Sequence, residues 1–229
     1  MTVFISPKDI LVDFLRYHLT DPRARAEATS TEAFDGGSTD YALTPPSGTM
    51  SCITSVTVNS VAQNKWTDYY IDVQNQEVIF YSATPAGAGI VSITYKYGAT
   101  NWIFPDKAKE TLSTSSFPRI SIMKVSGSGK RIGQYNAPVE KMNRFQIDIW
   151  VKEDYTATIG GIVYAEEKLA EYIAYQIQSA FEGNEKELFS QMYNYELLSG
   201  PNDLGFEKTY QCFHEQMDVE LRSIDEGIA

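Results

Sequence analysis

The stretch Phe-Gln-Ile-Asp-Ile-Trp-Val at residues 145–151 alternates between two sets of side chains over its whole length. Side chains along a β-strand point to opposite faces in turn, so the four aliphatic and phenyl side chains share one face. An apolar strand face must be covered by another element of structure. We therefore expect this strand to lie in a sheet that packs against helices.

Two helices and a further strand follow. After the pair Gly160-Gly161, apolar residues recur every three or four positions, which predicts an amphipathic helix over about residues 162–181. Helical spacing also predicts a short helix over residues 186–198. A closing strand over about residues 210–221 places three apolar side chains on one face: Met217, Val219 and Leu221.

A strand and a helix precede the central stretch. Residues 119–125 predict a strand that ends in a turn at Ser126-Gly127-Ser128-Gly129. Near the N-terminus, Ser6 is a favourable N-cap and Pro7 suits the first helical position, and apolar spacing predicts a helix to about Leu19. Because one side of this lone helix is strongly apolar, we expect it to pack on the later sheet.

Residues 28–98 carry the two-residue period of β-strands. Val56 and Val58 alternate with polar residues, and the stretch 91–97 does the same with four apolar residues. Turn-forming residues separate these runs at 35–38, 45–48 and 85–89. Short alternating strands at this spacing are typical of a small antiparallel sandwich or barrel.

The order of elements predicts an α+β fold in two parts. An antiparallel sheet packed with helices, formed by residues 1–30 and 100–229, is interrupted by a small all-β sandwich insertion at residues 31–99. A length of 229 residues suits one large or two small domains.

Composition excludes several functional classes. The chain has 30 Asp and Glu residues against 19 Lys and Arg residues, a formal net charge of −11. This acidic charge argues against a general nucleic-acid binder, because such a protein needs a basic face that displaces counterions from phosphates. No run approaches the roughly 20 apolar residues of a membrane helix, and the apolar N-terminus is too short for a signal peptide. We expect a soluble protein of cytosolic origin whose Cys52 and Cys212 are reduced thiols.

The string Gly127-Ser128-Gly129-Lys130 does not form a phosphate-binding loop. A Walker loop needs a glycine five positions before its Gly-Lys pair and a Ser or Thr after it, but Lys124 and Arg131 occupy these positions. We interpret the string as a flexible hairpin tip. Four cations lie close together here on an acidic chain, and they form a candidate contact loop for an acidic partner or a phosphate backbone: Lys130, Arg131, Lys141 and Arg144.

The titratable residues form no recognisable catalytic or metal-binding set. His18 lies on the apolar stripe of the first helix. Cys212 and His214 share a strand face, but they are too few ligands for zinc and poorly placed as a nucleophile pair. Glu166 falls inside the apolar arc of the long helix. We interpret it as a capping residue, with a buried general acid or base as the alternative. We expect no enzyme activity, cofactor or metal.

Aromatic residues suggest contact surfaces. Tyr164, Tyr172 and Tyr175 lie on the polar side of the predicted long helix, and large rings outside a core often mark interfaces, so these are candidate interface aromatics. Tyrosines of the β module, among them Tyr69 and Tyr95, are open to two interpretations. They either pack in pairs across strands or stack on sugars from one sheet face.

Two parts of the chain resemble proteins of tailed-virus particles. The β module resembles a sandwich recurrent in virion proteins of tailed phages, in the segments 56–59, 69–72, 78–80, 85–87 and 91–98. The flanking part resembles the tail terminator, or tail completion, family. The matching features are the capped helix at Ser6-Pro7, the strands around 119–125 and 144–151, the long helix, and the closing strand with residues 217–221.

The resemblance implies a structural virion protein with no catalytic positions. Such proteins form a ring, typically a hexamer, that caps the tail tube, joins it to the neck beneath the portal and leaves a channel for DNA. The implied partners are further copies of the chain, the tail tube protein, and a neck or connector protein, with DNA passing without sequence-specific binding. The implied location is the virion, after synthesis in the host cytoplasm. A head–tail connector or other neck protein, and a carbohydrate- or surface-binding β module, are the alternatives.

Overall fold

The computed structural model describes residues 6–25, 27–72, 75–98, 101–105, 114–131, 139–184 and 194–225. Within them the chain forms two α-helices, one short 3-10 helix and fourteen strands, and all strand pairs of its sheets except β8–β9 are antiparallel. The chain is therefore a mixed α+β protein that is mostly β. It divides into two compact units, Met1–Arg23 with Trp102–Ala229, and Ala24–Asn101.

The first unit contains both α-helices and the longest strands. In chain order its elements are α1 (Pro7–His18), β8 (Ile103–Phe104), the 3-10 helix η1 (Thr114–Ser116), β9 (Arg119–Arg131), β10 (Val139–Lys152), β11 (Thr156–Ile159), β12 (Ile162–Ala165), α2 (Glu166–Gly183), β13 (Asn194–Glu207) and β14 (Cys212–Asp225). The main sheet has the order β13-β14-β10-β9-β8.

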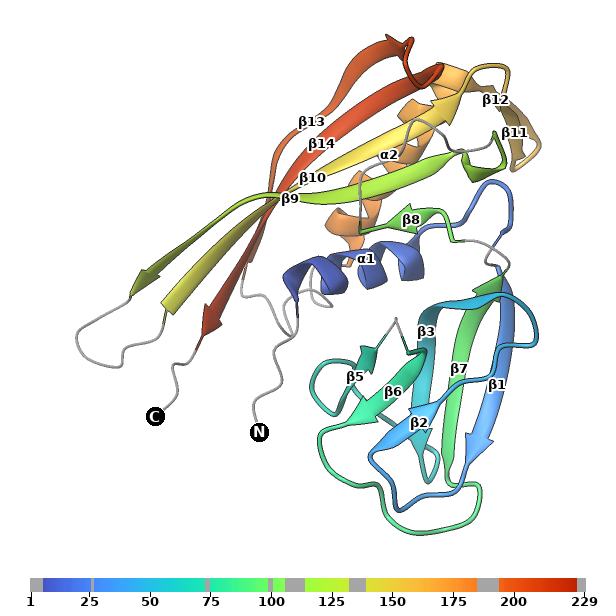
Figure 1. The fold of residues 1–229 in the computed structure, drawn as a ribbon, viewed down its shortest axis with the longest axis vertical. Helices are drawn as coiled ribbons and strands as arrows, with labels where there is room; N and C mark the ends of the chain where they lie inside the picture. Colours follow the sequence, from blue (N-terminus) through green and yellow to red (C-terminus); the bar gives the residue numbers. More distant parts are fainter. Residues whose placement is uncertain are drawn as a thin grey trace. The chain divides into compact units, whose positions relative to one another are not determined.

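Both helices pack on one face of this sheet, α2 on β10 and β14, and α1 on β8 and β9 (Figure 1). The strand over 145–151 is confirmed. Its Ile147 pairs with Met217 of β14 and with Ile122 of β9, and all three are buried beneath the helices. The phenyl rings of Phe14 and Phe181 stack 5.4 Å apart and join α1 to α2. The first helix thus packs as predicted.

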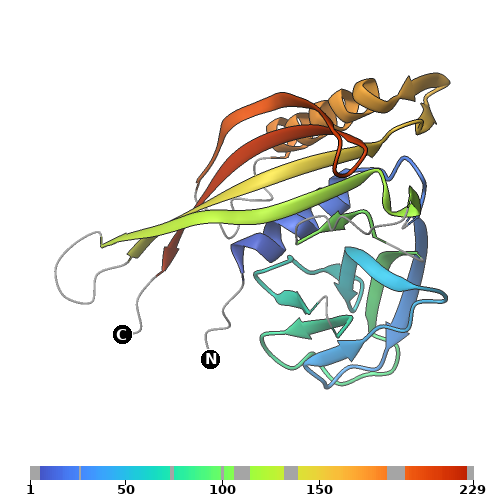
Figure 2. The ribbon, with the colours of Figure 1, turned by 45° about the horizontal axis from the view of Figure 1, so that its top comes forward.

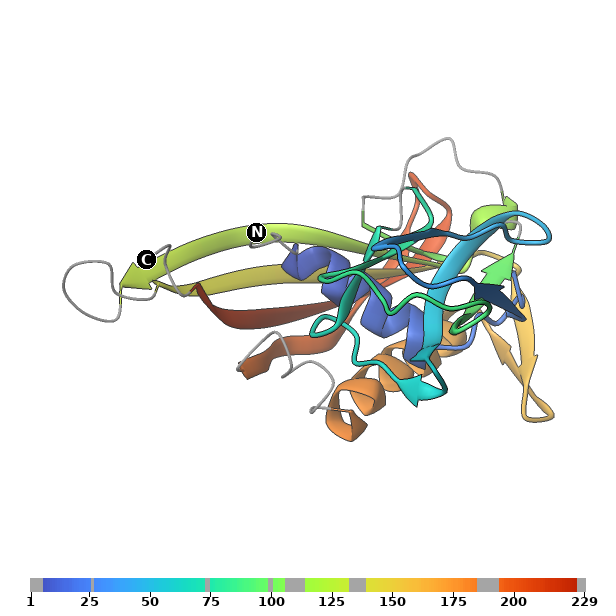
Figure 3. The ribbon, with the colours of Figure 1, turned by 90° about the horizontal axis from the view of Figure 1, so that it is seen from below.

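Three strands extend the sheet beyond its helix-covered part (Figures 1 and 3). β9 and β10 pair out to Arg131 and Val139, and β14 runs alongside as far as Asp225. We call this extension the arm: residues 124–131 of β9, 139–144 of β10 and the end of β14. The predicted turn at 126–129 is wrong, because these residues are paired within β9; residues 132–138, between the two strands, lie outside the described residues.

The start of the long helix also differs from the prediction. Gly160 and Gly161 have φ angles of 59° and 83°, a left-handed pair typical of a tight hairpin turn, and they connect β11 to β12. The helix therefore begins at Glu166, and Ile162 lies 58% exposed on the hairpin instead of in the helical core. Over only four residues, the apolar spacing of 162–165 fits a strand as well as a helix, so the sequence does not distinguish the two.

The predicted helix over 186–198 is wrong where it can be compared. Residues 185–193 lie outside the described residues, and the following residues form β13, in which Leu197 pairs with Val219 of β14. This edge strand carries three register shifts, so its sequence lacks the alternation of an ideal strand. Pairing along β14 decides its conformation.

The second unit is built from two sheets. Its strands are β1 (Ala28–Phe34), β2 (Asp40–Ala42), β3 (Thr49–Val58), β4 (Val61–Ala62), β5 (Tyr69–Asp72), β6 (Glu77–Phe80) and β7 (Val91–Gly98), in the orders β1-β7-β3-β4 and β2-β6-β5. The Phe34 and Tyr41 rings meet between the sheets with centroids 5.5 Å apart. Because β1 pairs with β7 from Ala28 onward, the unit begins before residue 30.

Candidate interaction surfaces

The three candidate interface tyrosines gather at one end of the first unit. Tyr164 of β12 lies against Tyr172 of α2, with ring centroids 4.7 Å apart. Tyr175 follows Tyr172 by three residues, which places it on the neighbouring position of the same helix surface, and it is 63% exposed. We call these three residues the tyrosine patch. The hairpin beside it also exposes Ile162 and Val163.

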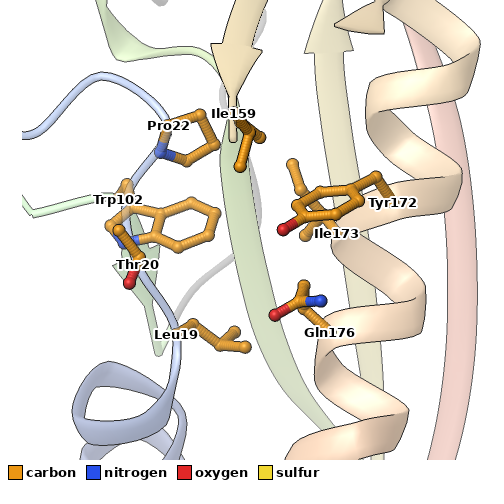
Figure 4. A pocket seen from close by; sticks show the side chains of 8 residues that line it. All are labelled: Leu19, Thr20, Pro22, Trp102, Ile159, Tyr172, Ile173 and Gln176. Carbon is orange, nitrogen blue, oxygen red and sulfur yellow. The ribbon is translucent and has the colours of Figure 1, made fainter. Parts of the chain in front are cut away.

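A cavity of about 200 Å³ lies next to the tyrosine patch. Figure 4 shows the Trp102 and Tyr172 rings projecting toward each other across it. Its remaining lining residues come from the segment after α1, from β11 and from α2: Leu19, Thr20, Pro22, Ile159, Ile173 and Gln176. An apolar cavity of about 150 Å³ accepts a benzene ring, so this one has room for an apolar side chain.

The four residues of the candidate contact loop lie on paired strands of the arm and not in a loop. Lys130 pairs with Glu140, Lys141 with Gly129, and Arg144 with Ser126. Arg144 donates to Asp218 of β14 at 2.6 Å, so its charge is compensated within the sheet. At the end of the arm, Lys130 and Arg131 are exposed and form no ion pair with any described residue.

An acidic cluster, which the sequence prediction missed, lies at the opposite end of the sheet. Asp203 of β13 pairs directly with Glu215 of β14. Glu215 is 3% exposed, and its Oε2 atom has no hydrogen-bond partner among the described residues. Burial, together with the negative charges of Asp203, Glu171 and Glu167, raises the pKa of Glu215 to about 7. We call these four residues the acidic cluster.

One signal in the sequence could have revealed Glu215. It has the same parity as Met217, Val219 and Leu221, so a strand that buries these three side chains also directs the carboxylate toward α2. Glu167 and Glu171 stand four residues apart on α2, where i and i+4 side chains are neighbours. Asp203 had no comparable signal, because it lies in the irregular part of β13.

The other face of the sheet carries a buried polar network. His214 Nε2 lies 2.9 Å from Asp148 Oδ1, and the His214 ring stacks on Trp150 with centroids 3.7 Å apart. Gln146 Nε2 also donates to Asp148 at 2.8 Å, and Asp148 is only 1% exposed. A buried carboxylate needs such partners, and this network gives the imidazole a structural role.

Cys212 and His214 share one face of β14 as expected from their spacing. Burial raises the pKa of the Cys212 thiol to about 12, so the thiol stays protonated at neutral pH and is a poor nucleophile. Its Sγ donates to the carbonyl of Tyr210 at 3.2 Å. Among the described residues, no group of three or more His, Cys, Asp or Glu side chains is arranged to hold a metal ion.

Glu166 lies at the first position of α2, half-buried, with φ of 30°. Its Oε1 accepts from the Asp154 backbone N–H at 3.2 Å, and its own N–H donates to the Tyr155 carbonyl at 3.1 Å. These bonds tie the start of the helix to the segment before β11. The contact differs from the expected cap, because the carboxylate accepts from a preceding loop and not from the helix.

In the second unit, the tyrosines considered for sugar stacking are buried. Tyr69 and Tyr95 are at most 2% exposed, and Tyr69 packs on Phe80 with centroids 5.8 Å apart. The stacking interpretation of these two residues is therefore wrong, and the packing interpretation is right. A separate open groove of about 440 Å³ lies beside half-exposed Tyr81 and includes Asn59, Gln63 and Asp68.

No protein-family model matches the chain, and no curated protein is significantly similar to it. Within the described residues, neither α-helix is long and apolar enough to cross a membrane.

Proposed function

We propose that this chain is a structural virion protein that assembles into a closed ring, as a tail terminator that ends the tail tube and joins it to the neck. One observation carries the proposal: two unlike surfaces lie at opposite ends of the main sheet in the first unit. The arm carries Lys130 and Arg131 at one end, and the tyrosine patch with its cavity is at the other. Figures 1 and 2 show the strands of the arm at one end of the sheet and the β11–β12 hairpin with the start of α2 at the other.

Two unlike surfaces favour a head-to-tail contact between copies. When one copy's arm meets the other end of the next copy, the contact is heterologous, and repetition closes into a ring if the rotation between copies allows it. A self-complementary dimer would instead use the same patch twice. The rigid paired strands of the arm suit this role, because they reach past the helix-covered sheet without the entropy loss of ordering a flexible loop.

The charge of the chain fits a ring that DNA passes through. A net charge of −11 gives a surface that on balance repels phosphates, so DNA slides without being held. The proposed partners are the tail tube protein on one side and a neck or connector protein on the other. A typical ring of this kind has six copies. A uniformly basic channel in the assembled ring would contradict this part of the proposal.

Two measurements test the function. Sedimentation velocity and negative-stain imaging of the purified chain over a range of concentrations should show a closed ring with a central channel. Particles assembled without the protein should carry overlong tails if it terminates the tube, or detached tails if it only joins tail to neck as a connector would. A chain that stays monomeric at every concentration, with tail tubes present, contradicts the proposal.

A carbohydrate-binding role for the second unit is the second candidate, and the groove beside Tyr81 favours it. Tyr70 and Tyr81 lie with ring centroids 5.7 Å apart, and amide and carboxylate side chains line the groove. Aromatic rings bordered by such groups are suited to sugars. A glycan array probed with the full chain and with the variant Tyr81→Ala tests this role. If the full chain binds no glycan on the array, the role is excluded.

A further inference from the structure

We propose that the acidic cluster of one copy receives the end of the arm, with Lys130 and Arg131, from a neighbouring copy. The inference rests on the proposed ring and names the two surfaces that meet in it. It also assigns a role to four carboxylates that no element of the proposed function otherwise uses.

The acidic cluster is incomplete within one copy. The Glu215 carboxylate is buried and leaves Oε2 without a hydrogen-bond partner among the described residues. Asp203 pairs with it across the ladder, the charges of Glu167 and Glu171 on α2 act on it, and none of the four forms an ion pair with a described Lys or Arg. An uncompensated buried carboxylate among like charges is unfavourable, and a cation placed over the exposed members of the cluster relieves it.

The arm supplies the complementary charge. Its residues 124–131 and 139–144 contain five Lys and Arg residues against one Glu, on a chain that is acidic overall. Arg144 is already bound to Asp218, but Lys130 and Arg131 are exposed and unpaired among the described residues. When a positive patch and a negative patch both remain uncompensated on one copy, the positive patch of one copy attracts the negative patch of the next. This attraction guides association and fixes the register between copies.

The arm of the same copy cannot fill the acidic cluster. Arg131 pairs with Val139, and Val139 pairs with Asp225 of β14, ten residues beyond Glu215. At about 3.3 Å per residue this separates the two positions by roughly 33 Å along the strands. No side chain spans that distance, so an arm that reaches the acidic cluster belongs to a second copy.

The acidic cluster also adjoins the tyrosine patch. Glu171 and Tyr175 stand four residues apart on α2, and Tyr175 is three residues from Tyr172, so the charged and aromatic groups form one continuous helix surface. A docking arm therefore meets carboxylates and exposed rings together. Such a mixture of anchors and charged groups is typical of specific interfaces.

A charge-swap experiment tests the contact. Two reversed variants of the full chain are made, Lys130→Glu with Arg131→Glu, and Glu171→Lys with Asp203→Lys, together with the variant that combines all four changes. Sedimentation equilibrium at 50 and 500 mM salt gives the association constants, and circular dichroism confirms folding. Glu182→Lys, an exposed reversal on α2 outside the cluster, is the matched control.

We expect each reversed pair to weaken association at least tenfold at low salt, the combined variant to recover most of the loss, and the control to match the original chain. A ring that forms with unchanged constants in both reversed variants overturns this contact and leaves the proposed function standing. Weakening without recovery in the folded combined variant also overturns the direct pairing. An original chain that never assembles removes the proposed function and this inference together.

Discussion

Asp203 of β13 lies directly across from Glu215 of β14, so two carboxylates share one rung of the antiparallel ladder. Like charges at paired positions destabilise a sheet. The fold tolerates this arrangement at the end of the sheet where α2, the tyrosine patch and the exposed hairpin also lie. In the proposed ring, a cation from a neighbouring copy would offset the like charges of this rung.

Replacing Glu215 with Gln should remove a pH dependence of stability. The pKa of Glu215 is about 7 in the folded chain, raised from 4.5 by burial and by Asp203, Glu171 and Glu167, with His214 opposing the shift. The folded chain therefore keeps a proton that the unfolded chain releases, so the free energy of unfolding decreases as the pH rises from about 4.5 to about 7.

Urea unfolding at pH 5 and pH 8 measures this effect. We expect Glu215→Gln to reduce the difference between the two pH values by roughly 1 to 3 kcal/mol, because one pKa unit corresponds to about 1.4 kcal/mol. The matched change Glu182→Gln, at an exposed position of α2, should keep the original difference. An unchanged difference in Glu215→Gln would show that this carboxyl titrates normally.

Replacing His214 with Ala should destabilise the first unit by about 2 to 4 kcal/mol, because it leaves the buried Asp148 carboxylate with one partner fewer and removes the stack on Trp150. His214→Ala should cost less stability when Asp148 is already replaced by Asn, since no carboxylate is then left without its partner. A double-mutant cycle in urea measures the coupling between His214 and Asp148, and additive effects would show that these two residues are not coupled.

Glu207→Gln is the control for this pair. Glu207 lies 3.9 Å from the same imidazole ring but is 41% exposed, so its replacement should cost under about 0.5 kcal/mol.

Replacing Tyr175 with Ala should weaken self-association without unfolding the chain. The ring is exposed, so we expect the free energy of unfolding to change by less than about 0.5 kcal/mol, whereas loss of an aromatic anchor should weaken association roughly tenfold. Light scattering across concentrations measures association. Tyr81→Ala, at a half-exposed tyrosine of the second unit, should leave it unchanged. Equal association by both variants would exclude the tyrosine patch from the contact.

Replacing Gly36 with Ala should destabilise the second unit by about 1 to 3 kcal/mol. A Cβ atom at this position would lie 1.9 Å from the Pro85 carbonyl oxygen and 2.6 Å from Ile90 Cδ1, and the backbone oxygen cannot move aside freely. Thermal unfolding measures the loss. In Gly183→Ala the new atom meets nothing within 4 Å, and helix propensity favours Ala, so stability should not fall. Equal melting temperatures for the two variants would contradict the close approach.

The sequence predicted elements whose own periodicity is regular. The strand over 145–151, the closing strand with Met217, and the helix after Pro7 all follow from alternation or from helical spacing. It failed where the pattern was short or irregular. Residues 162–165 fit a helix as well as a strand, and β13 has no clear alternation because its register shifts three times.

For the candidate surfaces, the sequence indicated which side chains are candidates for contacts but not which residues from distant segments lie beside them. It identified Lys130 and Arg131 as cations on an acidic chain, and Tyr164, Tyr172 and Tyr175 as rings outside a core. It did not identify the acidic cluster, because Glu167 and Asp203 are 36 positions apart and come together only when β13 pairs with β14 beneath α2.

Local side-chain spacing by itself therefore determined the regular elements, such as the strand over 145–151 and the helix after Pro7, and the composition determined the acidic charge of the chain. Only the tertiary structure decided that the cations extend along an arm and that Glu215 is buried without a cation. Periodicity is a property of neighbouring residues, whereas the separation of opposite charges at two ends of one sheet depends on strand register. That register is fixed by long-range pairing between segments distant in sequence.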